Sequence, residues 1–380
     1  MIQRAGLIKK IGLVSVLLMF VYMVVKTLSN GVNGPPMKSL EQPRERVRLE
    51  YKPENYVPPP DMKIPRIVHV TWKDNVLPSG TVQWVKRWAT TNSDWQVWFW
   101  TDADARQLVA KKFPSYLRLF DRYPAPIYKA DAMRYFILFE YGGVYADLDV
   151  EPLRSLNPLR DQTACVLSQE PDEHAKLLND VFSNDQKMLA CNAFMACRTG
   201  HPFFLSVLKN LEANHNLSER FHHAPGRTII STGPGMLTKM YTIYMNRSRK
   251  HLEQFPEDNV WLAPPDYFTP IFDPIKLQMI KFKCVRQFHL MSRLKRQVCL
   301  KLKSREFQNI PGEVAYTSHN WFHSWLSGEE GKEGRSAGFT NLTLQEIIPG
   351  IKEAKYLVDL QPEANVTGSR FCIPLISGKC

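Results

Sequence analysis

The chain has 380 residues, of which 44% are hydrophobic and 23% are charged, so it can build one large folded domain or two small ones and is not compositionally disordered. Its net charge of +12 indicates anionic partners: nucleic acid, an acidic membrane face or phosphate-bearing substrates. No internal repeat with the period of a solenoid protein is found in the sequence.

The first apolar segment, residues 11–26, is predicted to be a signal anchor, with residues 1–10 as a cytosolic tail. Residues 11–25 carry no charge and are flanked by basic residues. A spanning helix usually needs about 20 apolar residues, and tilt and snorkelling lysines can cover the shortfall. The alternative is a cleaved signal peptide, although the residues after Lys26 lack a clear cleavage site. Positive charge before the segment would then direct the remaining chain into the lumen.

Glycosylation sequons and cysteines agree with a luminal location. Four sequons occur beyond the segment, at Asn216, Asn246, Asn341 and Asn365. Seven cysteines fit an oxidising compartment where disulfides form, and the odd count leaves at least one thiol unpaired or intermolecular. No C-x-x-C motif occurs, which argues against a zinc site.

Residues 27–60 are rich in proline and charge and are predicted to form an extended stem. A catalytic domain is predicted over residues 61–330, followed by a C-terminal extension over residues 331–380. Within the domain, hydrophobic patterns and turn residues predict strands at 65–72, 95–101 and 144–150 and helices at 84–89, 102–113 and 127–141. Strands that alternate with helices predict an α/β fold with a mostly parallel sheet and ligands at the strand C-termini.

Two acidic residues end the third predicted strand. Asp147 and Asp149 are two residues apart, so on an ideal strand both side chains would point the same way. Two converging carboxylates would bind a hard divalent cation, which neutralises a diphosphate. Asp131 and Arg134 share one face of the preceding helix, and Gly142-Gly143 allows a sharp turn into the strand. A bare D-x-D triplet is frequent by chance, but this setting favours a functional site.

Six ordered sequence blocks resemble a known family, the DxD-type sugar transferases that include fungal α-1,6-mannosyltransferases and mannosyl-inositol-phosphorylceramide synthases. The blocks, within residues 64–326, are IPRIVHVTWK, WFWTD, FDRYPAPIYKADAMRYFILFEYGGVYADLD, NAFMACRTGHPFF, STGPGMLT and SHNWFHSW. The resemblance implies a GT-A-type, Rossmann-like fold with helices on both faces of the sheet. It also implies Mn²⁺ (or Mg²⁺) dependence, a retaining mechanism and a type II enzyme of the Golgi or ER membrane.

The resemblance also assigns roles to individual residues. Asp147 and Asp149 are expected to bind the metal and the diphosphate, with His319 as a further metal ligand. Asp131 and Arg134 are expected to hold donor-sugar hydroxyls. Trp72, after the first strand, is similar to an aromatic that stacks on the nucleotide base, with a core aromatic as the alternative, and Trp325 is expected to contact the donor.

Asp149 and Asn192 are the predicted catalytic residues. A carboxylate nucleophile near Asn192 is the alternative to direct transfer, but an amide is a poor nucleophile. The leaving diphosphate can itself deprotonate the incoming hydroxyl, so metal-assisted departure is the expected contribution of the protein. Ala193 follows Asn192 where the fungal sphingolipid enzymes usually carry an acid, which weakens any transfer of acceptor identity.

Several functions remain open at this point. The expected reaction moves a hexose, foremost mannose from GDP-mannose, onto a glycan or lipid acceptor such as an inositol phosphoceramide. One alternative is a UDP-galactose or UDP-N-acetylglucosamine donor, and another is an inactive sugar-nucleotide-binding or scaffolding relative. No nucleic-acid partner is expected, because the basic residues lie in a luminal chain.

The stretch 276–305 has no counterpart in the resemblance. It contains ten Lys/Arg residues and no Asp/Glu, interleaved with apolar residues. One interpretation is a luminal insertion, stapled by Cys284 and Cys299, that serves solubility alone. The other is a surface that meets anionic headgroups or a phosphate-bearing lipid acceptor.

Overall fold

The computed structural model describes residues 63–178, 188–218, 224–322 and 338–354. All of them lie within the second of two units of the chain, Val57–Cys380. The expected tail, anchor and stem lie outside the described residues. None of the helices in the described part is long and apolar enough to cross a bilayer.

A seven-stranded sheet forms the centre of the described fold, in the order β7-β5-β6-β3-β1-β2-β9. β1 is parallel to β2 and β3, while β6 is antiparallel to β3 and β5. The sheet is therefore mostly parallel, as predicted, with β6 reversed within it. The strands are β1 Ile67–Thr71, β2 Gln96–Trp100, β3 Gly143–Ala146, β5 Cys165–Gln169, β6 Ala190–Cys197, β7 Trp261–Leu262 and β9 Lys352–Glu353.

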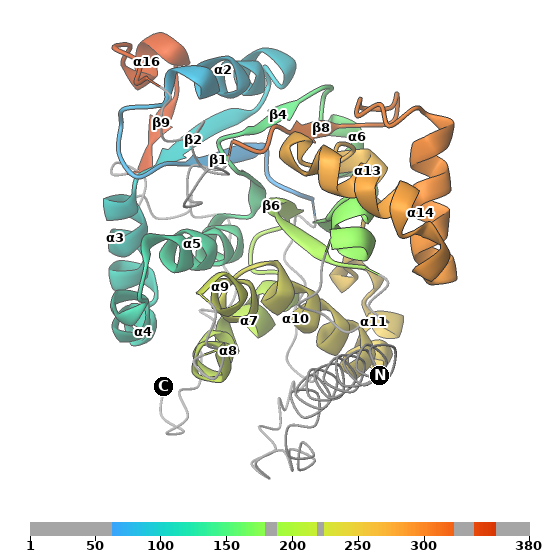
Figure 1. Ribbon diagram of the computed structural model, residues 1–380. Coiled ribbons are helices and arrows are strands. Elements are labelled where there is room, and N and C mark those ends of the chain that lie inside the picture. Colours follow the sequence, from blue (N-terminus) through green and yellow to red (C-terminus); the bar gives the residue numbers. More distant parts are fainter. Residues whose placement is uncertain (1–62, 179–187, 219–223, 323–337, 355–380) are drawn as a thin grey trace, which may run out of the picture. The chain divides into compact units, whose positions relative to one another are not determined.

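Helices cover both faces of this sheet (Figure 1). One core cluster joins α3, α5, α7 and α10 to strand residues such as Trp100 and Tyr145. The other joins α2, α6, α12 and α16 to the alternating residues, such as Val70 and Val144, because successive strand side chains face opposite ways. The helices are α2 Val82–Thr91, α3 Asp102–Lys112, α4 Leu117–Arg122, α5 Pro126–Tyr141, α6 Asn157–Gln162, α7 Pro202–Lys209, α8 Leu211–Ser218, α9 Ala224–Ser231, α10 Pro234–Arg247, α11 Arg249–Gln254, α12 Pro265–Phe268, α13 Leu277–Arg286, α14 Arg293–Ser304 and α16 Leu344–Ile347.

The central sheet takes its edge strand from beyond the predicted boundary at residue 330. β9 pairs in parallel with β2, and Ile347, Ile348 and Ile351 belong to the second core cluster. Part of the segment 331–380 is therefore integral to this sheet. The assignment of that segment as an extension stays a prediction for its remaining residues.

The predicted third strand is wrong in its extent, since β3 ends at Ala146 rather than at residue 150. The backbone N–H of Val150 donates to the carbonyl of Asp147 at 2.9 Å, which closes a turn. The chain then enters β4 (Val150–Pro152), which pairs with β8 (Thr317–His319) in a separate two-stranded sheet. Asp147 thus begins a turn and Asp149 lies within it, because the chain leaves one sheet there to join another.

Two glycines make the reversal between α5 and β3 possible, as expected. Gly142 and Gly143 have φ values of 63° and 87°, which favour glycine. A Cβ atom on Gly142 would lie 2.5 Å from the backbone nitrogen of Thr199, and one on Gly143 would lie 2.6 Å from the carbonyl oxygen of Ile67. The helix that carries Asp131 and Arg134 is therefore joined tightly to the strand that precedes Asp147.

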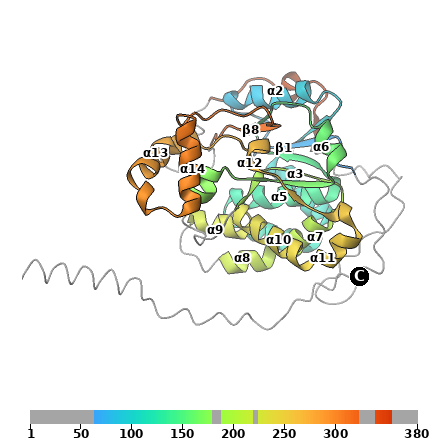
Figure 2. The ribbon, with the colours of Figure 1, turned by 90° about the vertical axis from the view of Figure 1, so that its right-hand side faces the viewer.

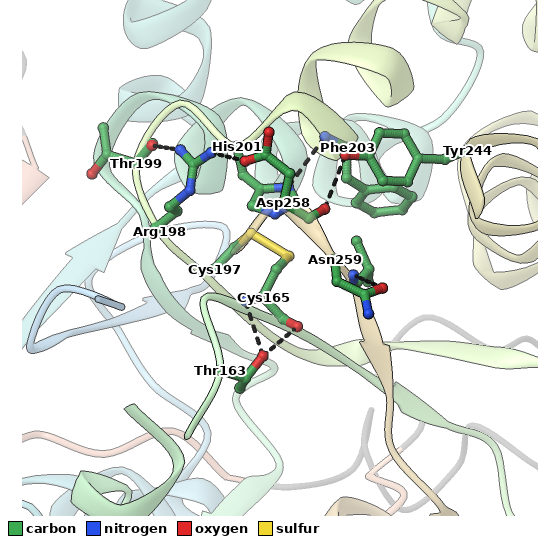
Figure 3. The surroundings of a disulfide bond; sticks show 11 residues. Thr163, Cys165, Cys197, Arg198, Thr199, His201, Phe203, Tyr244, Asp258 and Asn259 are labelled. Carbon is green, nitrogen blue, oxygen red and sulfur yellow. Dashed lines mark hydrogen bonds and ion pairs between the residues drawn. A yellow bond between two sulfur atoms is a disulfide. The ribbon is translucent and has the colours of Figure 1, made fainter. Parts of the chain in front are cut away.

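A disulfide and a buried ion pair hold the far end of β5 and β6 (Figure 3). Cys165 and Cys197 are register partners on these strands and are bonded to each other. Beside them, the fully buried Asp258 accepts a hydrogen bond from the guanidinium of Arg198 and pairs with His251 at 2.6 Å. A second disulfide joins Cys284 and Cys299, and Cys191 is a free buried thiol.

Candidate active site

Three neighbouring residues hold Asp147, which begins the turn between β3 and β4. Its backbone N–H donates to the carbonyl of Ala193 on β6 at 2.8 Å. The hydroxyl of Tyr145 donates to Asp147 Oδ1 at 2.7 Å, and Arg134 Nη1 lies 3.2 Å from the same oxygen. The reversed strand β6 therefore supports the backbone of the motif, while α5 supports its carboxylate.

Asp149 is held by the late segment of the chain. β8 pairs with β4 so that His319 lies opposite Val150, and the N–H of Asn320 donates to the Asp149 carbonyl at 2.8 Å. The N–H of Phe322 donates to Asp149 Oδ2 at 2.7 Å, and His319 Nε2 lies 3.2 Å from that oxygen. This segment therefore completes the surroundings of the D-x-D pair.

The donor set of this cluster fits a divalent cation. One ligand atom from each of Asp147, Asp149 and His319 lies within 4.8 Å of the others. His319 Nδ1 is buried and has no hydrogen-bond partner within the described structure, so the imidazole is not fully satisfied by the protein. Carboxylate oxygens with one imidazole suit Mn²⁺ or Mg²⁺.

Burial and charge act against each other in this cluster. Burial raises the pKa of Asp147, although Arg134 opposes it. For Asp149, burial is outweighed by His319 and the backbone N–H of Phe322 together, so its pKa is lowered. Burial disfavours the charged imidazole, but Asp149 and Asp147 raise the pKa of His319 to about 8. The cluster is therefore an anionic pair balanced by a protonated imidazole, whose proton a metal ion would displace on binding.

Asp131, Arg134 and Asn192 form a buried network beside Asp147. Arg134 Nη2 lies 2.9 Å from Asp131 Oδ1, and Arg134 Nη1 donates to the backbone carbonyl of Asn192 at 2.6 Å. The Asn192 amide donates to Asp131 Oδ1 at 2.9 Å, and the Thr232 hydroxyl donates to Asp131 Oδ2 at 3.1 Å. Burial raises the pKa of Asp131 to about 6, with Arg134 opposing the rise.

This network gives Asn192 a clear structural role. Its side chain orients Asp131 on α5, and its backbone carbonyl accepts from Arg134 on the same helix. The prediction that Asn192 is catalytic is not tested by this arrangement and stays a prediction. The contacts show an amide that donates to a carboxylate and do not show a nucleophile aimed at a substrate.

Asn192→Asp should disturb this network strongly. The change replaces a donor with a carboxylate beside Asp131, and a lost hydrogen bond to a charged group costs about 1.5–3 kcal/mol. We therefore expect a lower free energy of unfolding, measured by urea denaturation, together with reduced activity. Asn75→Asp, the same change at an exposed position, is the control and should have little effect. Equal stability of the two variants would contradict the assigned role.

Trp72 lies at the same sheet edge as the acidic pair. Val70 is in register with Ala146, so Trp72 and Asp147 both follow neighbouring parallel strands. The half-buried Trp72 packs against the second core cluster, and its indole Nε1 is buried without a partner in the described structure. Base stacking by Trp72 stays a prediction. Trp325 lies outside the described residues.

The sequence did not predict three aromatic residues that surround the candidate site, Tyr145, Trp321 and His174. Tyr145 donates to Asp147 and packs under Arg134, whose guanidinium carbon lies 4.8 Å from the ring centroid. Trp321 has a φ of 54°, and its ring lies 4.1 Å from that of His319 and 4.5 Å from that of His174. Tyr145 and Trp321 stand in the recognised blocks, but His174 has no sequence signal.

Comparison with known proteins identifies the central part of this site. Residues 78–166 match the family model described as "Glycosyltransferase sugar-binding region containing DXD motif". This region is therefore similar to the sugar-binding region of DXD-containing glycosyltransferases. The DXD region includes Asp131, Arg134, Asp147 and Asp149, whereas Asn192 and His319 lie beyond it.

Relatives of the DXD region include fungal mannosyltransferases. "Inositol phosphoceramide mannosyltransferase 3" of Schizosaccharomyces pombe is 34% identical over 209 residues, 54% of this chain and 51% of the relative. "Initiation-specific alpha-1,6-mannosyltransferase" of Candida albicans is 22% identical over 65% of this chain and 71% of the relative. The alignment thus spans about half the length of the first relative. Among solved structures, "PaToxG Glycosyltransferase" has a TM-score of 0.35 and 15% identity, covering 68% of this chain and 90% of that one.

Proposed function

We propose that this chain is a metal-dependent, retaining glycosyltransferase that transfers a hexose from a nucleotide-sugar donor. The observation that carries the proposal is the convergence of Asp147, Asp149 and His319 beside the Asp131–Arg134 pair. The match of residues 78–166 to a DXD-containing sugar-binding region supports the same reaction class. We also propose that the fold is of the GT-A type.

The three ligands would hold the cation, which when bound supplies positive charge to the diphosphate leaving group. The residues of the chain would do the remaining work. Arg134 is fully buried and holds both Asp131 and Asp147 in place. Burial of these groups strengthens their interactions, because the surrounding dielectric constant is lower than in water. Asp131 and Arg134 would orient the donor sugar.

The names of the relatives favour mannose and a lipid acceptor. The first relative is named an inositol phosphoceramide mannosyltransferase, and another is named an α-1,6-mannosyltransferase. We therefore propose GDP-mannose as the donor and an inositol phosphoceramide as the acceptor. A type II location in the Golgi or ER membrane, with Mn²⁺ as the metal, belongs to the same proposal. The exposed sequon residues Asn216, Asn246 and Asn341 are compatible with luminal glycosylation.

A donor screen tests this function. The full chain would be purified in detergent and supplied with Mn²⁺ and GDP-mannose, UDP-galactose or UDP-N-acetylglucosamine, with inositol phosphoceramide as acceptor. We expect turnover with GDP-mannose and loss of that turnover with a chelator. NMR of the product should show an α linkage, whereas a β linkage would exclude retention. Turnover with a UDP-sugar alone would overturn the mannose assignment. The absence of turnover with every donor would contradict the proposal that the chain is an active glycosyltransferase.

A further inference from the structure

The basic stretch 276–305 forms a helical hairpin of α13 and α14 with a well-packed inner face. The disulfide between Cys284 and Cys299 joins the two helices, with Cα atoms 5.2 Å apart. The inner residues pack on Leu177 and Phe272 in a third core cluster, and comprise Ile280, Cys284, Met291, Val298, Cys299 and Leu302. Internal packing therefore accounts for these apolar residues and for the disulfide.

The outer face of the hairpin carries apolar residues that this packing leaves exposed. On α13, Met279, Phe282 and Val285 are 49%, 56% and 61% exposed, and their spacing of three places them along one side of the helix. Leu290, in the connection between the helices, is 75% exposed. Leu294 and Leu300 on α14 add to the same set. A concentration of exposed apolar side chains indicates a binding surface.

Cations surround these apolar residues, and acids are absent from the stretch. Some of the ten cations have partners in the fold: Lys301 pairs with Asp266, Arg305 pairs with Glu173, and Lys283 donates to the Leu177 carbonyl. Arg286 and Arg293 are exposed and Lys295 is half-buried, and the described structure shows no ion pair for these three residues. The outer face therefore combines unneutralised positive charge with exposed apolar side chains.

We propose that α13, α14 and their connection form a docking surface for an anionic lipid bilayer. A bilayer offers acidic headgroups to the cations and an apolar layer to Phe282 and Leu290, whereas nucleic acid offers only the charges. The hairpin stands at one side of the described fold (Figure 2). The proposal requires no particular donor or reaction and does not rest on the proposed function.

A chain of contacts joins the residue before the hairpin to the acidic cluster. The backbone N–H of Asp273, just before α13, donates to His174 Nε2 at 3.0 Å. The His174 ring contacts that of Trp321, which contacts His319. The segment that carries His319 is therefore linked by contacts to the residue that precedes the hairpin.

A tryptophan reporter tests the docking in the full chain. Leu290→Trp places an indole at the most exposed apolar position, and Leu342→Trp is the control at another exposed leucine. Both proteins would be reconstituted in vesicles with brominated acyl chains, made of phosphatidylcholine with or without phosphatidylserine. We expect quenching, relative to the parent chain, at position 290 but not at 342. The quenching should be several-fold stronger with phosphatidylserine and should weaken with salt.

A charge-removal variant separates docking from anchoring elsewhere in the chain. Arg286→Gln, Arg293→Gln and Lys295→Gln would be combined with the reporter at position 290. Each cation near an acidic surface strengthens binding about fivefold, so the triple change should weaken docking about a hundredfold. The matched control is Arg247→Gln, Arg249→Gln and Lys250→Gln, three exposed cations on α10 and α11, which should leave quenching unchanged.

The outcomes decide the proposal. Loss of quenching only in the first triple variant supports it, provided that circular dichroism shows an unchanged fold. No quenching of the Trp at position 290 in either vesicle would mean that another segment of the chain or a protein covers this face, and would overturn it. Equal quenching with and without phosphatidylserine would also overturn it, because the cations would then have no part in docking.

Discussion

Asp149→Asn is expected to reduce turnover with Mn²⁺ by at least about a hundredfold, because the proposed cation would lose one of its carboxylate ligands. The fold should persist. The amide oxygen can still accept from the N–H of Phe322, which lies 2.7 Å from Asp149 Oδ2 in the wild-type structure. The measurements are initial rates with GDP-mannose, Mn²⁺ affinity by titration calorimetry, and thermal unfolding.

The control for this variant is Asp161→Asn, which makes the same change at an exposed carboxylate on α6. Its turnover and Mn²⁺ affinity should match those of the wild type. If Asp149→Asn instead kept near-normal turnover and metal affinity, the metal site would have to lie elsewhere. A parallel loss of thermal stability would show that Asp149 is required for folding rather than for the reaction.

Asp258→Ala should produce the largest loss of stability. Asp258 and Arg198 are 0% and 1% exposed, so removal of the carboxylate leaves an uncompensated buried guanidinium. Breaking such a pair costs about 3–5 kcal/mol, which corresponds to a fall in Tm of roughly 10 °C for a domain of this size. His251 would lose the same partner.

An exposed ion pair supplies the comparison for Asp258→Ala. Lys63 Nζ lies 2.9 Å from Asp161 Oδ1, but the two side chains are 52% and 59% exposed. Asp161→Ala should therefore change stability by no more than about 1 kcal/mol, since water screens the pair. Calorimetry of both variants would test the contrast. Similar Tm values would show that the buried pair is dispensable.

Local pattern was sufficient for the first half of the fold. The β-branched run before Trp72, the acidic start of α3 and the Gly-Gly pair after α5 each have a local physical cause. The observed elements accordingly agree with the predicted ones to within two residues at most ends. The extent of β3 could not be predicted in this way. It depends on β8, which comes from a distant part of the sequence and draws the chain into a second sheet.

The residues of the candidate site divide in the same way: local sequence pattern predicts some of them, and the fold alone brings the others together. Asp147 and Asp149 stand out in the sequence, and Asp131 and Arg134 follow from helical spacing. By contrast, the reversed strand β6 brings Asn192 to Asp131, and the contact between Trp321 and His174 depends on tertiary packing. No periodicity in the sequence predicts these contacts. From the sequence, only the family resemblance predicted that His319 lies beside Asp147 and Asp149.

The pairing of β4 with β8 has a consequence for biosynthesis. Asn320 binds the carbonyl of Asp149 across a sequence separation of 171 residues. At about 5–20 residues per second, the ribosome needs roughly 9–34 s to add the intervening chain. During that interval the nascent polypeptide has the two carboxylates without the histidine that accompanies them. The proposed cation site would therefore be complete only after His319 has been added to the chain.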